Sequence, residues 1–222
     1  MRSAKLVAIA CLALLCVGAI GAGSAQAAKF RSEVSSTVLS AAQQTLNEFD
    51  FENPYGASFN CSEATASGLM SGSTAEKLVL APTYDSCEYV GLPLASWSMN
   101  GCEYSFTVTG SSPNDGFMQL VCPAGKSVQM KFQLSVSTYC TVTVPAQAGF
   151  LVDYTNEGSA STRRVLMTST ATGMRYVVQY VGAGSYCGKA GEHADGKYTG
   201  SILVKGFQKG EKELTQVGLW VE

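Results

Sequence analysis

The chain has 222 residues, with 15 Lys and Arg against 17 Asp and Glu, and only 14% of its residues are charged. It contains no block of basic residues, so nucleic acid and anionic membrane surfaces are not expected partners. This length fits one domain, or at most two small ones.

Residues 1–27 have the pattern of a secretory signal peptide. Arg2 and Lys5 form a positive start, residues 6–20 are uncharged and apolar, and Ala25-Gln26-Ala27 is a small-x-small cleavage site. The apolar run of 15 residues is short for a membrane span of about 20. We therefore predict cleavage after Ala27 and no membrane insertion afterwards, with an uncleaved anchor as the alternative.

The predicted mature chain, residues 28–222, keeps 13 basic and 17 acidic residues because Arg2 and Lys5 are lost, which gives a formal charge of −4. An even number of cysteines in a secreted chain favours disulfides over a metal site. No Cys-x-x-Cys occurs, and the single histidine, His193, is not near a cysteine pair. We predict no metal and no cofactor, and three disulfides among Cys61, Cys87, Cys102, Cys122, Cys140 and Cys187.

The N-terminal part of the mature chain is the least regular in pattern. In residues 35–49 the apolar side chains do not recur at the spacing that would put them on one face of a helix. We therefore predict a strand there, with a short helix as the alternative. The sequence from Glu52 to Gly56 contains Asn and Pro and is typical of a hairpin turn. Residues 77–82 form the next predicted strand.

A stapled hairpin is predicted from Cys102 to Cys122. If these cysteines face each other across an antiparallel pair, Tyr104 lies opposite Leu120 and Phe106 opposite Met118. The register that joins the cysteines therefore also brings the apolar side chains together, and a slip of one residue would destroy both matches. By elimination, Cys61–Cys87 and Cys140–Cys187 are the expected remaining pairs.

Alternation of apolar and polar residues dominates the rest of the chain. The clearest case is residues 127–136, where Val128, Met130 and Phe132 share one face. Further strands are predicted at 139–145, 150–155, 164–169, 174–181, 198–207 and 216–222. The predicted fold class is all-β: an antiparallel β-sandwich (or barrel-like) domain with three disulfides, forming a single extracellular unit over residues 28–222.

Common catalytic arrangements are not found in the sequence. A hydrolytic triad would need His193, which lies in a predicted polar loop from Gly191 to Gly196 and is expected to be an exposed turn residue. No Gly-x-Ser-x-Gly elbow, phosphate-binding loop or dinucleotide fingerprint occurs. We therefore predict no catalytic residue and no enzyme activity.

The weak ligand candidates are carboxylates and a tryptophan. Glu48, Asp50 and Glu52 alternate along the chain and would share one face of a strand, where they could hold a calcium ion or a sugar, or lie in solvent. Trp97 could stack on a sugar ring, but packing within the protein is the favoured role for it and for Trp220. Trp220 is expected on the opposite face from its apolar neighbours.

Several segments together resemble a group of uncharacterised, secreted, cysteine-containing and β-rich proteins of high-GC Gram-positive bacteria. These are NGCEYSF at 100–106, VCPAGKSV at 121–128, CTVTVPAQ at 140–147, the late Cys187, GKYTGSILVKG at 196–206, and the segments around Cys61 and Cys87. The resemblance implies an extracellular, disulfide-bonded β protein and carries no known activity.

The functional expectation is a secreted or cell-surface module that binds or has a structural role at or near the cell envelope. Its ligand is unknown, and a cell-wall glycan or a surface protein is the candidate partner. The alternative is a secreted, carboxylate-dependent glycan hydrolase or a lectin. The two alternatives differ in whether Glu48, Asp50 and Glu52 line a concave pocket with Trp97 or Tyr55.

Overall fold

The computed structural model describes residues 28–56, 58–89, 95–109, 114–135, 137–182, 186–210 and 213–222. Apart from one short 3-10 turn, η1 (Ala160–Thr162), all the regular elements in these ranges are strands. None of the described residues belongs to a helix of the length and apolar character needed to cross a membrane. The strands are β1 (Phe30–Ser32), β2 (Thr37–Asp50), β3 (Ser58–Met70), β4 (Thr74–Ala75), β5 (Lys77–Tyr89), β6 (Ala95–Ser98), β7 (Glu103–Val108), β8 (Asp115–Val121), β9 (Val128–Ser135), β10 (Thr138–Val144), β11 (Gln147–Glu157), β12 (Arg164–Val181), β13 (Gly191–Lys209), β14 (Leu214–Val217) and β15 (Leu219–Val221).

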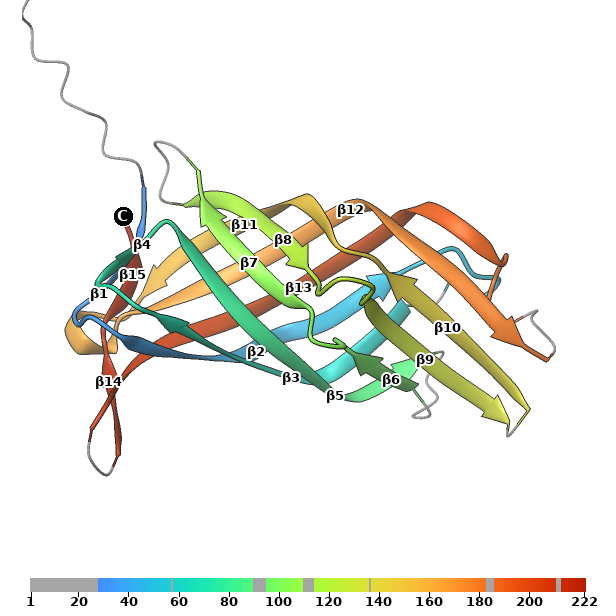
Figure 1. Cartoon of the computed structure of the whole chain (residues 1–222), viewed down its shortest axis with the longest axis horizontal. Helices are drawn as coiled ribbons and strands as arrows, with labels where there is room; N and C mark the ends of the chain where they lie inside the picture. Colours follow the sequence, from blue (N-terminus) through green and yellow to red (C-terminus); the bar gives the residue numbers. More distant parts are fainter. Residues whose placement is uncertain are drawn as a thin grey trace, which may run out of the picture.

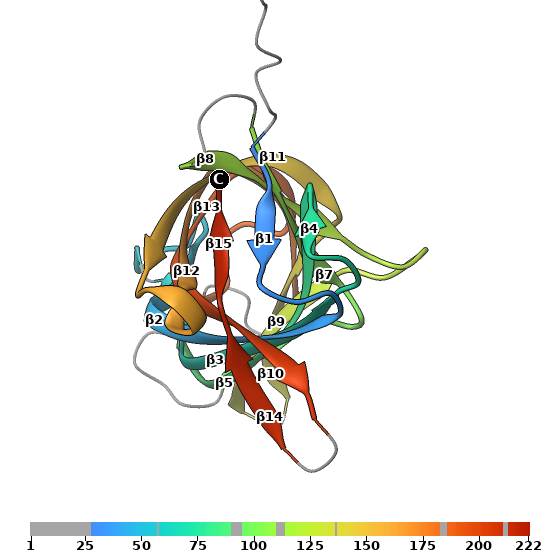
Figure 2. The same ribbon diagram turned by 90° about the vertical axis from the view of Figure 1, so that its left-hand side faces the viewer.

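The large sheet closes on itself. Within the described chain, the strand order is β13-β2-β3-β5-β7-β8-β11-β12, and β12 then pairs with β13. Neighbouring strands are antiparallel throughout, and the end-on view in Figure 2 shows them arranged around a common axis. The predicted all-β, antiparallel class is confirmed. Of the two predicted forms, sandwich and barrel-like, this closed ring corresponds to the barrel-like form.

One long strand, β12, has two successive neighbours on the same edge. Residues 164–170 pair with β11, whereas residues 177–181 pair with β10. Strands β9 and β6 continue the sheet beyond β10, so the molecule is elongated (Figure 1). The sequence pattern predicted two strands here, because Gly173 interrupts the alternation; in the structure Gly173 (φ +69°) lies in a bulge and the strand runs through it.

A small sheet of β15, β1 and β4 lies across one end of the ring (Figures 1 and 2). Phe30 from β1 is fully buried and packs edge-to-face on Tyr154, with 5.4 Å between ring centroids. The predicted strand at 216–222 is divided at Gly218 into β14 and β15, because its two parts join different sheets. As predicted, Trp220 is more exposed than Leu219 and Val221 on either side.

Strict alternation builds the core. In β8 every second residue is buried, and β7 pairs with it in the predicted register, with Tyr104 opposite Leu120 and Phe106 opposite Met118. These four side chains all face the interior. The N-terminal segment is a strand, β2, followed by a turn and β3, so the strand prediction for residues 35–49 is confirmed over the helix.

Three disulfides link residues that lie in the strands or in the segments between them. They are Cys61–Cys87, Cys102–Cys122 and Cys140–Cys187, the pairing predicted from the sequence. Cys61–Cys87 joins opposite positions of β3 and β5, and Cys102–Cys122 closes the β7–β8 hairpin. Disulfides within one chain are typical of proteins that fold in an oxidising, extracellular environment.

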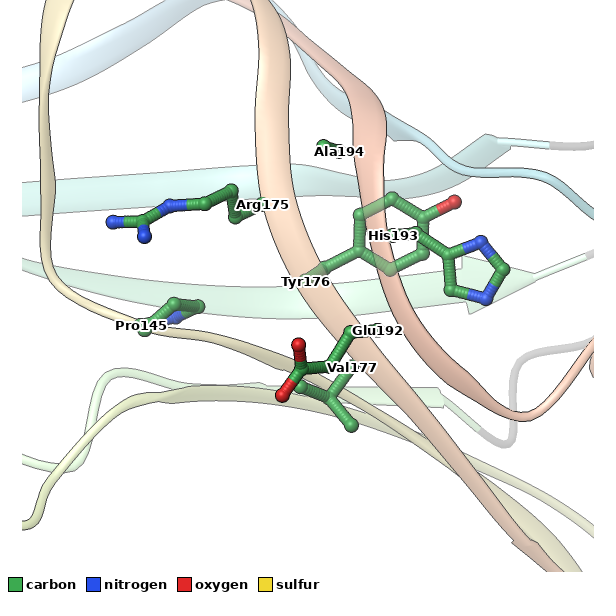
Figure 3. A pocket seen from close by; sticks show the side chains of 7 residues that line it. All are labelled: Pro145, Arg175, Tyr176, Val177, Glu192, His193 and Ala194. Atoms are coloured by element: carbon green, nitrogen blue, oxygen red, sulfur yellow. The ribbon is translucent and has the colours of Figure 1, made fainter.

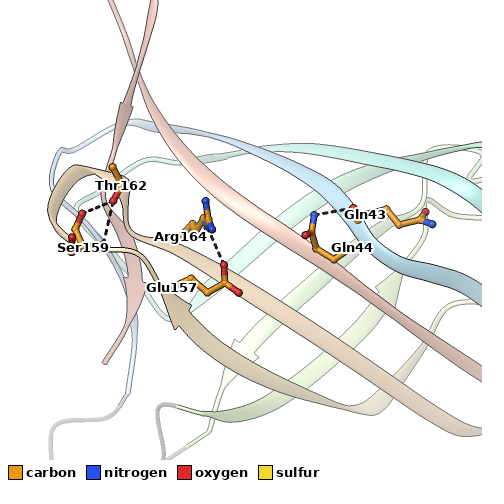
Figure 4. A network of polar contacts seen from close by, with 6 residues as sticks. All are labelled: Gln43, Gln44, Glu157, Ser159, Thr162 and Arg164. Carbon is orange, nitrogen blue, oxygen red and sulfur yellow. Dashed lines mark hydrogen bonds and ion pairs between the residues drawn. The ribbon is translucent and has the colours of Figure 1, made fainter.

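Short polar contacts close the β11–β12 hairpin, at the end of the molecule near the small sheet (Figure 4). Arg164 and Glu157 face each other across the two strands and form an ion pair of 3.0 Å. In the turn between them, the hydroxyl of Thr162 donates to the carbonyl of Ser159. The ion pair is partly buried and the Thr162 bond is exposed, and together they hold the turn of this hairpin.

Candidate functional site

A groove opens where β12 changes partners. It has a volume of about 340 Å³ and is lined by Pro145, Arg175 and Val177 together with Glu192 and His193 (Figure 3). Arg175 and Glu192 are exposed, so the groove faces solvent. Its size is within the range of small-molecule sites.

The change of partners explains why a groove forms at this point. β10 ends before Pro145, which has no N–H to donate to a neighbouring strand. The side chain of Gln147 then bridges the gap: it donates to the carbonyl of Arg175 (3.0 Å) and accepts from the Arg175 N–H (2.9 Å). The Gln147 side chain thus makes the two backbone hydrogen bonds of Arg175 that a neighbouring strand would otherwise make. Because no strand lies there, space remains beside Arg175.

His193 lies at the edge of this groove, but not in a loop. The predicted polar loop from Gly191 to Gly196 is wrong, because these residues begin β13 and His193 pairs with Tyr176 of β12. The pattern GEHADG has no apolar alternation, so only pairing with the long β12 makes it a strand. The expectation of an exposed His193 is also wrong: its side chain is 9% exposed.

The imidazole of His193 is held on three sides. Its ring stacks on Tyr176, with 4.9 Å between centroids and 7° between planes. Nε2 lies 2.8 Å from the carbonyl of Lys189, and Nδ1 lies 3.6 Å from a carboxylate oxygen of Glu52. Among the described residues, the polar contacts of the His193 ring are therefore with a backbone carbonyl and a carboxylate.

Tyr176 connects the groove to the loop after β2. Its hydroxyl accepts from the Glu52 N–H and donates to Asp195, both at 2.9 Å. Burial raises the pKa of Tyr176 above its ordinary value, and the bond to Asp195 acts in the same direction. Tyr176 therefore stays protonated at neutral pH and serves to position the loop.

The structure keeps Glu48 and Asp50 on one face of a strand, as predicted, but places Glu52 outside that strand. Glu48 and Asp50 alternate with the buried Phe49, so they lie on the outer face of β2, where Asp50 accepts from the Ser58 hydroxyl at 2.5 Å. Glu52 lies beyond the end of β2, near His193, with 65% of its side chain exposed. The described residues contain no group of three or more His, Cys, Asp or Glu that could hold a metal ion.

Trp97 lies in the core. It stacks on Tyr84 at 4.4 Å between centroids and meets Phe59 and Tyr198 edge-on. Its side chain is therefore not available to an external ligand and does not join the carboxylates of β2.

A buried polar chain also runs through the core, which the sequence pattern did not reveal. Tyr198 donates to Asn47 (2.6 Å), and Asn47 donates to Gln43 (2.6 Å). The hydroxyl of Tyr84 donates to Tyr104 at 3.1 Å and lies 3.4 Å from that of Tyr198. Burial raises the pKa of Tyr198 to about 12. The sequence signal for this chain of hydrogen bonds is Asn47, a polar residue at an inward-facing position of β2. It can be recognised as inward-facing only when the register of β2 is known.

The most exposed aromatic contact lies in the loops next to Glu52. Tyr55 and Tyr186 are 50% and 42% exposed, and their rings stack with 5.8 Å between centroids and 18° between planes. The sequence analysis named Tyr55 only as a possible neighbour of the carboxylates, and it did not identify Tyr186. The Pro54-Tyr55-Gly56 turn was the available signal, since it places an aromatic ring at a loop tip.

We use the name loop-end surface for the area that combines this tyrosine pair with the groove. Glu52 links the two parts: its carboxylate lies 3.6 Å from Nδ1 of His193, and its carbonyl packs against Gly188, two residues after Tyr186. It is made up of Glu52, Tyr55, Arg175, Tyr186, Glu192 and His193.

Comparison of the chain with protein-family models, with curated proteins and with solved structures found no match.

Proposed function

We propose that this protein is a secreted, non-catalytic binding module that acts at or near the cell envelope through its loop-end surface. The observation that carries the proposal is the anchored presentation of exposed rings and charges at this one surface. Tyr55 and Tyr186 are about half exposed, yet a hydrogen bond holds the backbone of each, and Cys187, next to Tyr186, forms a disulfide. Groups held in place before binding lose little conformational entropy when a ligand arrives.

The predicted alternative was a carboxylate-dependent glycan hydrolase or a lectin. Hydrolysis requires two carboxyl groups that face one substrate from opposite sides. Glu48 and Asp50 instead lie side by side on the outer face of one strand, and Trp97 is buried away from them. Binding, which includes the lectin form of this alternative, therefore has more support than hydrolysis.

Pull-down on isolated cell-envelope fractions tests the proposal. The protein should bind, and the double variant Tyr55→Ala/Tyr186→Ala should bind less. Phe117→Ala is the matched control, because Phe117 is 43% exposed, close to the value for Tyr186, and lies on β8, away from the loop-end surface. Equal loss in the control and the double variant, or no binding by the unmodified protein, would contradict the proposal.

A further inference from the structure

The tyrosine pair of the loop-end surface is exposed but firmly anchored. The carbonyl of Tyr186 accepts from the hydroxyl of Tyr89 at 3.2 Å, and the next residue, Cys187, is fully buried in its disulfide to Cys140. Tyr186 is therefore fixed from two sides, by a strand of the ring and by a covalent bond to β10.

The other ring is anchored by its own turn. The N–H of Tyr55 donates to the side-chain oxygen of Asn53 at 3.0 Å, and the side-chain nitrogen of Asn53 donates to the carbonyl of Phe51 at 2.7 Å. Gly188 (φ +79°) allows the two loops to pack closely, because a Cβ there would lie 2.3 Å from the Glu52 carbonyl. Two separate loops thus present one pair of nearly parallel rings to solvent.

The chemistry of this pair selects a class of ligand. The face of an aromatic ring carries partial negative charge and attracts C–H groups with partial positive charge, such as those on the flat side of a pyranose. The exposed carboxylate of Glu52 can accept hydrogen bonds from sugar hydroxyls. In the groove beyond His193, Arg175 and Glu192 are of opposite charge, so the surface does not favour a strongly charged polymer.

We infer, resting on the binding function proposed above, that the ligand is a neutral pyranose glycan of the cell envelope. Because the two tyrosine rings cover each other's inner faces, a sugar ring stacks on the outer face of one of them, and its hydroxyls donate to Glu52. Tyr55 and Tyr186 are the specificity-determining residues, because their ring faces contact the flat C–H side of the sugar.

Binding to envelope fractions treated in three ways tests this ligand class. Periodate opens pyranose rings that keep two adjacent free hydroxyls, which is the kind of glycan tested here. Protease removes proteins, and a mock treatment is the reference. We expect binding to survive protease and to fall at least tenfold after periodate. Soluble neutral polysaccharide released from the same envelope should compete with the untreated fraction.

Variants then locate the contact. Tyr55→Ala or Tyr186→Ala should weaken binding about 3- to 10-fold, the effect of losing one aromatic contact, whereas Tyr55→Phe and Tyr186→Phe should stay within about threefold because the ring remains. Phe117→Ala should bind as the unmodified protein does. Melting temperatures that stay equal across the set show that the fold is retained.

The outcomes separate the two proposals. Binding that resists periodate but is lost after protease means a protein partner, which overturns the glycan inference and leaves the binding function standing. Periodate-sensitive binding that is unchanged in both alanine variants places the glycan elsewhere and overturns the assigned site. Absence of binding to every fraction overturns the proposed function itself.

Discussion

The buried polar chain predicts that one hydroxyl group in the core matters more than its neighbour. In Tyr198→Phe, the side-chain oxygen of Asn47 loses the hydroxyl that donates to it at 2.6 Å. Asn47 is fully buried, so no solvent can replace that donor without opening the ring of strands. Leaving a buried acceptor unpaired costs about 1–3 kcal/mol of unfolding free energy.

Tyr104→Phe is the matched control. Tyr104 and Tyr198 are 8% and 6% exposed, and both substitutions remove one hydroxyl from a buried ring. The Tyr84 hydroxyl, which donates to Tyr104 at 3.1 Å, retains the oxygen of Tyr198 as a second acceptor at 3.4 Å. We therefore expect Tyr104→Phe to cost less than about 1 kcal/mol.

Urea unfolding with the disulfides intact measures both costs. Trp97 packs on Tyr84 and Tyr198, so its fluorescence reports the loss of this part of the core. For a chain of this size, each kcal/mol should lower the melting temperature by about 2–4 °C. A cost below about 0.5 kcal/mol for Tyr198→Phe, or a larger cost for Tyr104→Phe, would refute the role assigned to Asn47.

Three further predictions concern the disulfides, the loops and pH. Replacing both cysteines of Cys140–Cys187 by Ser should destabilise the protein by about 4 kcal/mol, and replacing both of Cys102–Cys122 by about 3 kcal/mol. The difference follows from the chain-entropy model, because the sequence separations are 47 and 20. Urea unfolding of each variant checks which disulfide contributes more. Gly188→Ala should lower the melting temperature and weaken envelope binding. Gly125→Ala is its control, because Gly125 has a similar positive φ (+70°) but no atom lies within 4 Å of the new Cβ. The control should show only the backbone cost of about 1 kcal/mol. The pKa of Tyr198 is about 12 in the folded state and about 10 in the unfolded state, so the unfolded state loses its proton first and stability should fall as pH rises from 10 to 12. The tyrosinate absorbance that Tyr198 contributes, taken as the difference from Tyr198→Phe, should rise together with unfolding rather than before it.

The hairpin from Cys102 to Cys122 shows how much a local pattern can determine. The cysteine spacing and the apolar alternation each require the same register, and the structure has that register. The strands β9 and β10 were recognised in the same way, because a strand with one buried face must alternate. The all-β class and the Cys102–Cys122 pair follow from information of this local kind, whereas the other two disulfide pairs were expected only by elimination.

The candidate site follows from contacts between distant segments. Tyr55 and Tyr186 are 131 residues apart in the sequence, and neither lies in a pattern that predicts the other. His193 is drawn into β13 by the backbone of β12, although its own segment reads as a loop. The predicted carboxylate group was divided because Glu52 lies past the end of β2, where the chain turns toward Tyr176.

The sequence by itself determined the strands with one buried face, the reading of the cysteines as disulfides, and the register of one hairpin, because each depends on neighbours a few residues apart. Only the tertiary structure decided that the strands close into a ring, that β12 changes partners at Arg175, and that two loops bring their tyrosines together. The physical reason is that a strand's backbone groups pair with any strand that reaches them, so side-chain periodicity fixes which face is buried but not which strand lies alongside.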